Sequence, residues 1–143
     1  MDTQGAPVLP ADEPATSLLV VDDDPFIARL LQIELTAAGF EVRTAGNGAA
    51  ALELALERRP DLVVADVMMP TVDGFELTRW LRNDERTAAT KVILLTARGL
   101  SEGKLEGFAV GADEYLVKPF DPPALLERIR EVLARPARAA RPA

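Results

Sequence analysis

The sequence predicts an α/β protein in which helices cover both faces of a five-stranded parallel sheet. Five short runs rich in valine, isoleucine and leucine recur along the chain, and each is followed by a segment with the apolar period of a helix. This alternation is typical of a parallel sheet covered on both faces. The 143 residues suffice for one domain, which can bury about two thirds of the surface of its unfolded chain.

The expected strands share β-branched and leucine side chains and cover residues 18–21, 41–45, 62–65, 92–95 and 115–117. The second run alternates polar and apolar residues, which favours a place at the edge of the sheet. We expect the folded domain to extend over residues 17–135. Residues 136–143 lack an apolar period, so we expect a disordered tail or linker stub there. The acidic, proline-containing residues 1–16 are also expected to be disordered.

The first two expected helices have clear start and stop signals. The first begins after Asp24, has Pro25 at its first position and ends at Gly39. Aspartate is a preferred N-cap, so Asp24 is better explained as a cap than as a metal ligand. The second helix covers residues 49–58 and ends before Pro60, because the residue before a proline disfavours helical backbone.

The remaining three helices are also marked by capping residues. Asp73 can cap the third helix, and Ser101 can cap the fourth, which Gly111 closes. The last helix begins at Asp121 and Pro122. Five strands and five helices are therefore expected.

The composition excludes several kinds of chemistry. The chain has no cysteine and no histidine, so disulfides, thiolate metal sites and histidine-based catalysis are impossible. No run approaches the length of a membrane span, so we expect a soluble cytoplasmic protein. The net charge of −7 disfavours direct binding to nucleic acid or to an anionic membrane.

Three aspartates form the most informative pattern in the chain. Asp22 and Asp23 directly follow the first expected strand, and Asp66 follows the third. Ligands of an open parallel sheet gather outside the carboxyl ends of its strands, so these carboxylates are expected in one crevice. Three neighbouring anions repel one another unless a cation with oxygen preference lies among them. The pattern therefore predicts a site for Mg²⁺, or for the similar Mn²⁺.

Two more polar residues follow expected strands. Thr96 ends the fourth strand and Lys118 the fifth. Taken singly, each of the five residues has an ordinary explanation as a helix-entry, turn or solvated residue. Together they offer complementary groups for phosphoryl transfer: carboxylates for a cation and a nucleophile, and an ammonium and a hydroxyl for phosphoryl oxygens.

Four separated motifs carry a family resemblance. They are Leu-Val-Val-Asp-Asp-Asp-Pro at 19–25, Asp-Leu-Val-Val-Ala-Asp-Val-Met-Met-Pro at 61–70 followed by Asp73 and Gly74, Val-Ile-Leu-Leu-Thr-Ala at 92–97, and Gly-Ala-Asp-Glu-Tyr-Leu-Val-Lys-Pro-Phe at 111–120. Over residues 17–135 the chain resembles the receiver domains of the two-component response-regulator family. The resemblance implies a flavodoxin-like, doubly wound sheet with strand order 2-1-3-4-5.

The same resemblance implies a signalling switch rather than a metabolic enzyme. Asp66 would accept a phosphoryl group from a phosphohistidine of a histidine kinase or phosphotransfer protein. Asp23, Asp66 and the backbone carbonyl of Met68 would bind Mg²⁺ directly, and Asp22 would act through a water molecule. The domain would assist its own phosphorylation and dephosphorylation.

Further residues take roles by the same resemblance. Lys118 would contact a phosphoryl oxygen, and Thr96 would turn its hydroxyl toward the group. Tyr115 matches an aromatic residue whose rotamer follows Thr96. The bond between Lys118 and Pro119 is cis in the family. The surface of helix 4, strand 5 and helix 5 would then change and control a downstream target or an output domain.

A weak dimer through this surface is a further expectation. Relatives joined to winged-helix DNA-binding domains dimerise there through acid-base pairs. By position, Asp113 with Arg130 and Glu114 with Arg128 match two such pairs. Exposed ion pairs are weak, and a solvated face explains these charges at least as well.

Three rival functions remain open on the sequence. Residues 46–51, Gly-Asn-Gly-Ala-Ala-Ala, satisfy a loose dinucleotide-binding fingerprint, and Asp66 lies 20 residues beyond its first glycine. Asp22 and Asp24 have the Asp-x-Asp spacing of aspartate-nucleophile phosphatases. The third rival is a receiver-like scaffold that is never phosphorylated.

Overall fold

The sheet has the topology that the resemblance implies. The computed structural model describes residues 15–97 and 110–136. Five parallel strands pair in the order β2-β1-β3-β4-β5, so the expected order is confirmed. The strands are β1 (Ser17–Val21), β2 (Glu41–Ala45), β3 (Leu62–Asp66), β4 (Lys91–Ala97) and β5 (Glu114–Lys118). The alternating second run lies at an edge, as expected for a strand exposed along one side.

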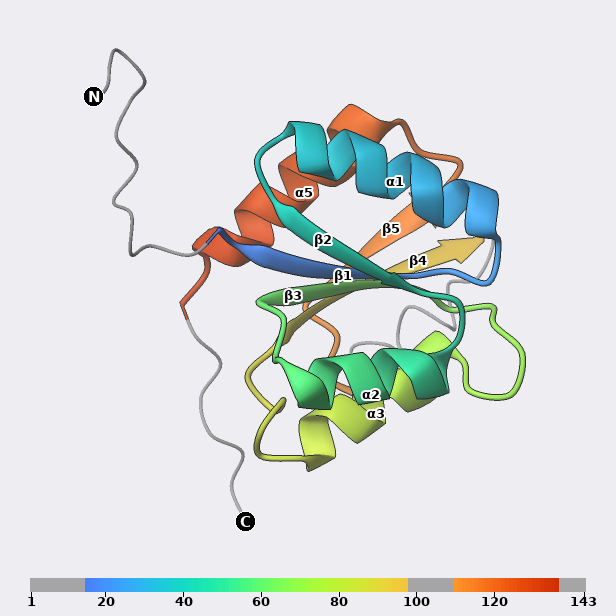
Figure 1. Cartoon of the computed structure of the whole chain (residues 1–143), viewed down its shortest axis with the longest axis vertical. Helices are drawn as coiled ribbons and strands as arrows, with labels where there is room; N and C mark the ends of the chain where they lie inside the picture. Colours follow the sequence, from blue (N-terminus) through green and yellow to red (C-terminus); the bar gives the residue numbers. More distant parts are fainter. Residues whose placement is uncertain (1–14, 98–109, 137–143) are drawn as a thin grey trace.

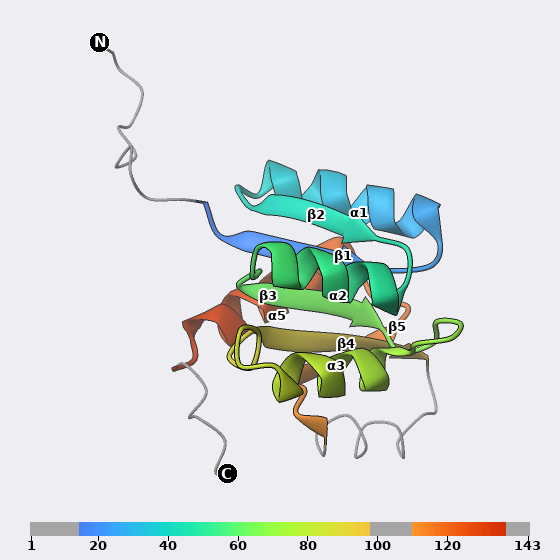
Figure 2. The ribbon, with the colours of Figure 1, turned by 60° about the horizontal axis from the view of Figure 1, so that its bottom comes forward.

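Two helical layers enclose this sheet. The helices of the described residues are α1 (Pro25–Ala37), α2 (Gly48–Glu57), α3 (Gly74–Asn83) and α5 (Pro122–Ala134). Helices α1 and α5 cover one face and α2 and α3 the other (Figure 1). Figure 2 shows α2 and α3 side by side on their face of the sheet.

Side chains alternate between the two faces along each central strand. In β1, Leu18 and Val20 pack into the core beneath α1 and α5, whereas Leu19 and Val21 pack beneath α2 and α3. All four are almost completely buried. A strand buried on both faces needs apolar residues at every position, which explains why these runs are continuous rather than alternating.

The helix boundaries follow the capping signals closely. Asp24 accepts hydrogen bonds from the backbone N–H groups of Phe26 and Ile27, so its expected role as a cap is confirmed. Asp73 and Asp121 cap α3 and α5 in the same way. Helix α2 begins one residue earlier than expected, because the side chain of Asn47 caps it, and ends one residue earlier, because the backbone of Arg58 is extended.

The expected fourth helix lies outside the described residues. Its cap Ser101 and most of its length fall within residues 98–109, so the described ranges contain four of the five expected helices. The expectations for residues 1–14 and 137–143 also lie outside these ranges. No helix in the described ranges combines the length and apolar character that a membrane span requires.

Candidate metal centre

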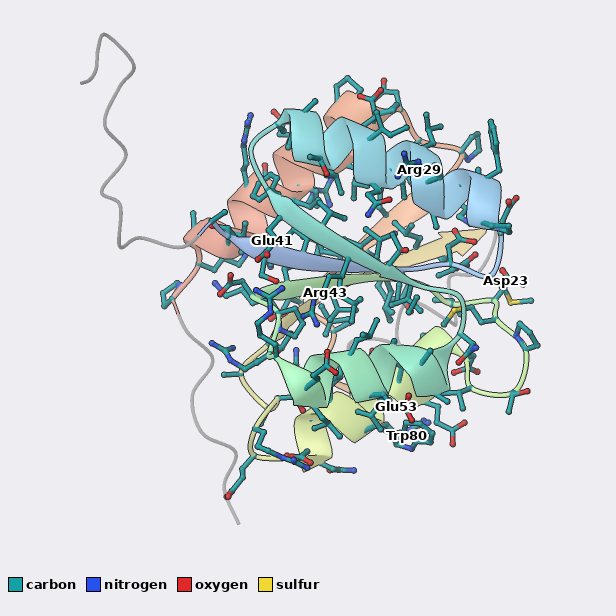
Figure 3. All side chains as sticks on the ribbon, viewed as in Figure 1. Asp23, Arg29, Glu41, Arg43, Glu53 and Trp80 are labelled. Carbon is teal, nitrogen blue, oxygen red and sulfur yellow. The ribbon has the colours of Figure 1, made fainter. Side chains whose placement is uncertain are left out.

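The strand order brings the three aspartates together. In the pairing of β1 with β3, Val21 lies opposite Ala65, so Asp22 and Asp66 follow at neighbouring strand ends. Asp22, Asp23 and Asp66 each offer a carboxylate oxygen within 4.8 Å of the others. Figure 3 shows Asp23 at the end of the sheet toward which the strands run. The cluster expected from the sequence is present.

The main chain fixes one oxygen of each buried carboxylate. The backbone N–H of Asp24 donates to Oδ1 of Asp22 at 2.9 Å, and that of Met68 donates to Oδ1 of Asp66 at 3.1 Å. Asp22 is 2% exposed and Asp66 is 6% exposed, whereas Asp23 is exposed to solvent. Each buried side chain therefore keeps its Oδ2 atom for other partners.

Lys118 lies beside these Oδ2 atoms. Its Nζ donates to Oδ2 of Asp66 at 2.8 Å and lies 3.7 Å from Oδ2 of Asp22. Burial lowers the pKa of Lys118, but the hydrogen bond and charge of Asp66, together with the charge of Asp22, outweigh it and raise the pKa overall. Lys118 therefore carries its charge at neutral pH.

Asp22 lies in an environment that disfavours its charge. Burial raises the pKa of Asp22, and the charges of Asp66 and Asp23 act in the same direction, although the N–H of Asp24 and the Lys118 charge oppose them. Its Oδ2 atom is buried and accepts no hydrogen bond within the described part of the chain. A buried, unsatisfied carboxylate oxygen is costly unless a cation completes it.

The ligand atoms that this cluster offers fit a hard divalent cation. They are all carboxylate oxygens, and one of them is buried without a hydrogen bond among the described residues. The Lys118 ammonium contacts two of the three acids, at 2.8 Å from Asp66 and 3.7 Å from Asp22. Oxygen donors with excess negative charge suit Mg²⁺ or Mn²⁺, whereas zinc sites favour nitrogen and sulfur.

A buried hydroxyl lies on the strand next to this cluster. Thr96 is 2% exposed, and its Oγ1 has no hydrogen-bond partner among the described residues. Asp66 lies opposite Leu95 in the pairing of β3 with β4, so Thr96 is one residue beyond the level of Asp66. An unsatisfied buried hydroxyl next to an acidic cluster is available to a ligand that brings an acceptor.

Tyr115 and the bond after Lys118 complete the expected set. In the pairing of β4 with β5, Tyr115 lies opposite Leu94, which is two residues before Thr96. Tyr115 is 5% exposed. The side chain thus lies in the core beneath α2 and α3. The peptide bond between Lys118 and Pro119 is cis.

The residues behind two of the rival functions have structural roles instead. Asp24 is occupied as the cap of α1, so it does not form an Asp-x-Asp pair with Asp22. The glycine-rich stretch follows the edge strand β2, and Asn47 within it caps α2. A dinucleotide fingerprint belongs after a central strand, at a topological switch point.

Arg82 is a buried arginine that no sequence pattern indicated. It is 3% exposed and pairs with Asp113 at 3.0 Å, while donating to the backbone carbonyls of Ala88, Thr90 and Gly111. The pattern of α3 marks Arg82 as an ordinary charged residue. Its burial becomes evident only when the loops after α3 and before β5 are in place.

The two acids assigned to a dimer interface already have partners within one chain. Asp113 pairs with Arg82, and Glu114 lies 2.9 Å from Arg135 and 3.6 Å from Arg128. Burial raises the pKa of Glu114, but hydrogen bonds and nearby arginine charges outweigh this and lower it overall. These contacts give no support to the expected dimer.

Comparison with known proteins points to one family. The family described as response regulator receiver domain matches residues 18–130. The DNA-binding dual master transcriptional regulator RpaA of Synechocystis is 47% identical over 118 residues, which are 82% of this chain and 49% of RpaA. The phosphate regulon transcriptional regulatory protein PhoB of Pseudomonas aeruginosa is 40% identical over 83% of this chain and 52% of PhoB. The chain thus spans about half the length of these relatives.

Two solved structures match this chain over nearly their whole length. A response regulator from Chloroflexus aurantiacus matches with a TM-score of 0.80 and 40% identity, over 86% of this chain and 100% of the other. The chemotaxis protein CheY4 of Vibrio cholerae matches with a TM-score of 0.80 and 39% identity, over 83% of this chain and 99% of the other.

Proposed function

Because the chain belongs to the response regulator receiver family, whose members are phosphorylation-activated switches, we propose that Asp66 is the residue that accepts the phosphoryl group. The observation that carries this proposal is the position of Oδ2 of Asp66. It is held 2.8 Å from the Lys118 ammonium and lies in a cluster with two further carboxylates. An acceptor oxygen with a cation beside it suits a reaction that gathers negative charge.

In the proposed reaction, a carboxylate oxygen of Asp66 attacks the phosphorus of a phosphohistidine. A new O–P bond forms, the P–N bond breaks, and the imidazole nitrogen keeps the electron pair of the broken bond. The product is an acyl phosphate on Asp66. The donor would be a histidine kinase or a phosphotransfer protein.

Asp23, Asp66 and the backbone carbonyl of Met68 would hold Mg²⁺ or Mn²⁺, with Asp22 acting through a bound water. When bound, the cation supplies positive charge that offsets the repulsion between the carboxylates and the incoming phosphoryl oxygens. The unsatisfied Oδ2 of Asp22 supports this assignment.

Three neighbouring side chains would respond to the new group. The Lys118 ammonium would transfer its hydrogen bond from Asp66 to a phosphoryl oxygen. The hydroxyl of Thr96, which has no partner in the described part of the chain, would donate to another phosphoryl oxygen, and Tyr115 would follow Thr96 on the same face of the sheet. A group with a charge of about −2 is large enough to bias a packed surface between two arrangements.

The consequence would be a changed surface at β5 and α5 that controls a downstream target or an attached output domain. RpaA and PhoB are named as transcriptional regulators, and this chain aligns with only about half of each. The net charge of −7 disfavours direct contact between this chain and nucleic acid. Any DNA binding would therefore be carried out by the downstream target or the output domain. A weak phosphorylation-dependent dimer stays a prediction.

Incubation with acetyl phosphate, followed by intact mass spectrometry, tests the proposal without a partner kinase. We expect the mass of one phosphoryl group to be added with Mg²⁺ present and not with a chelator. If the protein gains no mass with Mg²⁺, the unphosphorylated scaffold becomes the better explanation.

A further inference from the structure

We propose that Gly48 and Gly74 are positioning residues for the acceptor site, an inference that rests on the proposed function of Asp66. Residues 67–73, here called the site loop, connect β3 to α3 and include Met68. The two glycines lie at the first positions of α2 and α3. Because neither glycine has a side chain, part of the site loop can occupy the space beside each of them.

Gly74 lies directly against the backbone of the acceptor. A Cβ atom at this position would lie 2.8 Å from the carbonyl oxygen of Asp66 and 3.0 Å from Cα of Val67. Both are main-chain atoms, which cannot rotate away as a side chain can. The N–H of Gly74 also donates to the carbonyl of Val67 at 3.1 Å. A methyl group here therefore has to displace Asp66 or move the start of α3.

Gly48 packs closely against the far end of the site loop. A Cβ atom here would lie 2.5 Å from Cγ1, 2.8 Å from Cβ and 2.9 Å from the carbonyl oxygen of Val72. The residue before Val72 is Thr71, whose φ of 69° is unusual for a β-branched side chain. The loop is thus tightly turned where α2 presses on it, and it has little freedom to yield.

The contact with Val72 explains a glycine at position 48 without nucleotide binding. A Cβ atom at Gly46 would meet no atom within 4 Å, whereas one at Gly48 would collide with Val72. Neither glycine has a positive φ, so a side chain strains the backbone at neither position. The two glycines belong to the same turn and differ in this one respect. Gly46 is therefore a matched control for Gly48.

Displacing the site loop would alter the acceptor geometry. Oδ1 of Asp66 is held by the N–H of Met68, a loop residue, and Oδ2 is held by Lys118 from outside the loop. A shift of the loop relative to β5 would change both contacts together. The proposed cation ligands would also move relative to one another, since Met68 lies in the loop and Asp23 does not.

The test compares wild type with the variants Gly46→Ala, Gly48→Ala and Gly74→Ala. Three quantities are measured on each: the free energy of unfolding, Mg²⁺ affinity by calorimetry, and the rate of phosphorylation by acetyl phosphate. Backbone amide shifts of Val67 and Met68 in metal-free protein report the loop position directly. A fifth protein, Gly48→Ala with Val72→Ala, removes the Cγ1 atom that causes the shortest contact.

We expect folded Gly48→Ala and Gly74→Ala to lose about tenfold or more in phosphorylation rate, since a misplacement near 1 Å can cost about a hundredfold. Both variants should also bind Mg²⁺ more weakly than wild type. Gly46→Ala should match wild type, and Val72→Ala should restore part of the loss in Gly48→Ala. If Gly74→Ala does not fold, Gly48→Ala and its double variant decide the question.

Wild-type Mg²⁺ affinity and rate in the folded glycine variants would overturn the inference and show that the glycines serve packing alone. Equal losses in Gly46→Ala would also overturn it. By contrast, a wild-type protein that neither binds Mg²⁺ nor becomes phosphorylated would refute the proposed function itself.

Discussion

The Nζ atom of Lys118 lies 2.8 Å from Oδ2 of Asp66, at the ends of two strands that are not neighbours in the sheet. The strand between them, β4, carries the hydroxyl of Thr96, which has no hydrogen-bond partner among the described residues. A cation, an acceptor oxygen and a free donor are thus delivered by three consecutive strands of the sheet.

Replacing Lys118 by methionine should destabilise the metal-free protein. The change removes the only ammonium that faces Asp66 and Asp22 among the described residues, and leaves two buried carboxylates facing each other. Because Lys118 is 33% exposed, we expect a modest loss of about 1 to 3 kcal/mol in the free energy of unfolding. Urea unfolding with and without Mg²⁺ measures it. An unchanged stability without Mg²⁺ would argue against the charge balance described here.

Replacing Asp22 by asparagine should stabilise the metal-free protein near neutral pH. The pKa of Asp22 is raised above its ordinary 3.8, chiefly by burial, so folding favours the protonated form. The wild type therefore loses stability as the pH rises through this raised pKa, and below 3.8 the penalty is absent. Asparagine keeps an acceptor for the Asp24 N–H. The difference between variant and wild type should appear in unfolding curves as the pH is raised, and a difference that grows toward acid pH would have the wrong sign.

Replacing the exposed Asp23 by asparagine should separate cation binding from folding. The side chain is exposed, so the metal-free stability should stay within about 0.5 kcal/mol of wild type. The stabilisation that Mg²⁺ gives to wild type, about 2.7 kcal/mol at a hundredfold excess over the dissociation constant, should be largely lost. Thermal unfolding across a Mg²⁺ series checks both parts. Full retention of the Mg²⁺ effect would exclude Asp23 as a ligand.

Replacing Arg82 by methionine should be strongly destabilising. The side chain is buried and pairs with Asp113, whose carboxylate also accepts the N–H of Val92. Loss of one partner of a buried pair costs about 3–5 kcal/mol. The matched control is Arg86→Met, whose guanidinium pairs with Asp84 at an exposed site and should cost less than about 1 kcal/mol. Equal losses in the two variants would contradict the role given to Arg82.

The features best predicted from the sequence are those that depend only on residues close together in the chain. Strands and caps follow from local patterns, and Asp24 and Asp73 cap their helices as expected. The three aspartates were placed together by the rule that strand ends share an edge. The strand order itself came from the family resemblance, because local patterns do not say which strands are neighbours.

Contacts between residues far apart in the chain could not be predicted from the sequence. Arg82 looks like any surface arginine of a helix until two loops close over it. Gly48 looks like part of a phosphate-binding turn until Val72, 24 positions later, fills the space beside it. Both properties belong to tertiary packing and leave no periodic signal in the chain.

Phosphorylation of matched variants tests whether Asp66 is the acceptor. Wild type, Asp66→Asn and Asp84→Asn are treated with Mg²⁺ and acetyl phosphate and compared by intact mass, Asp84 being a carboxylate outside the cluster. We predict one added phosphoryl group on wild type and on Asp84→Asn, and none on Asp66→Asn. Phosphorylation of Asp66→Asn at the wild-type rate would contradict the assignment.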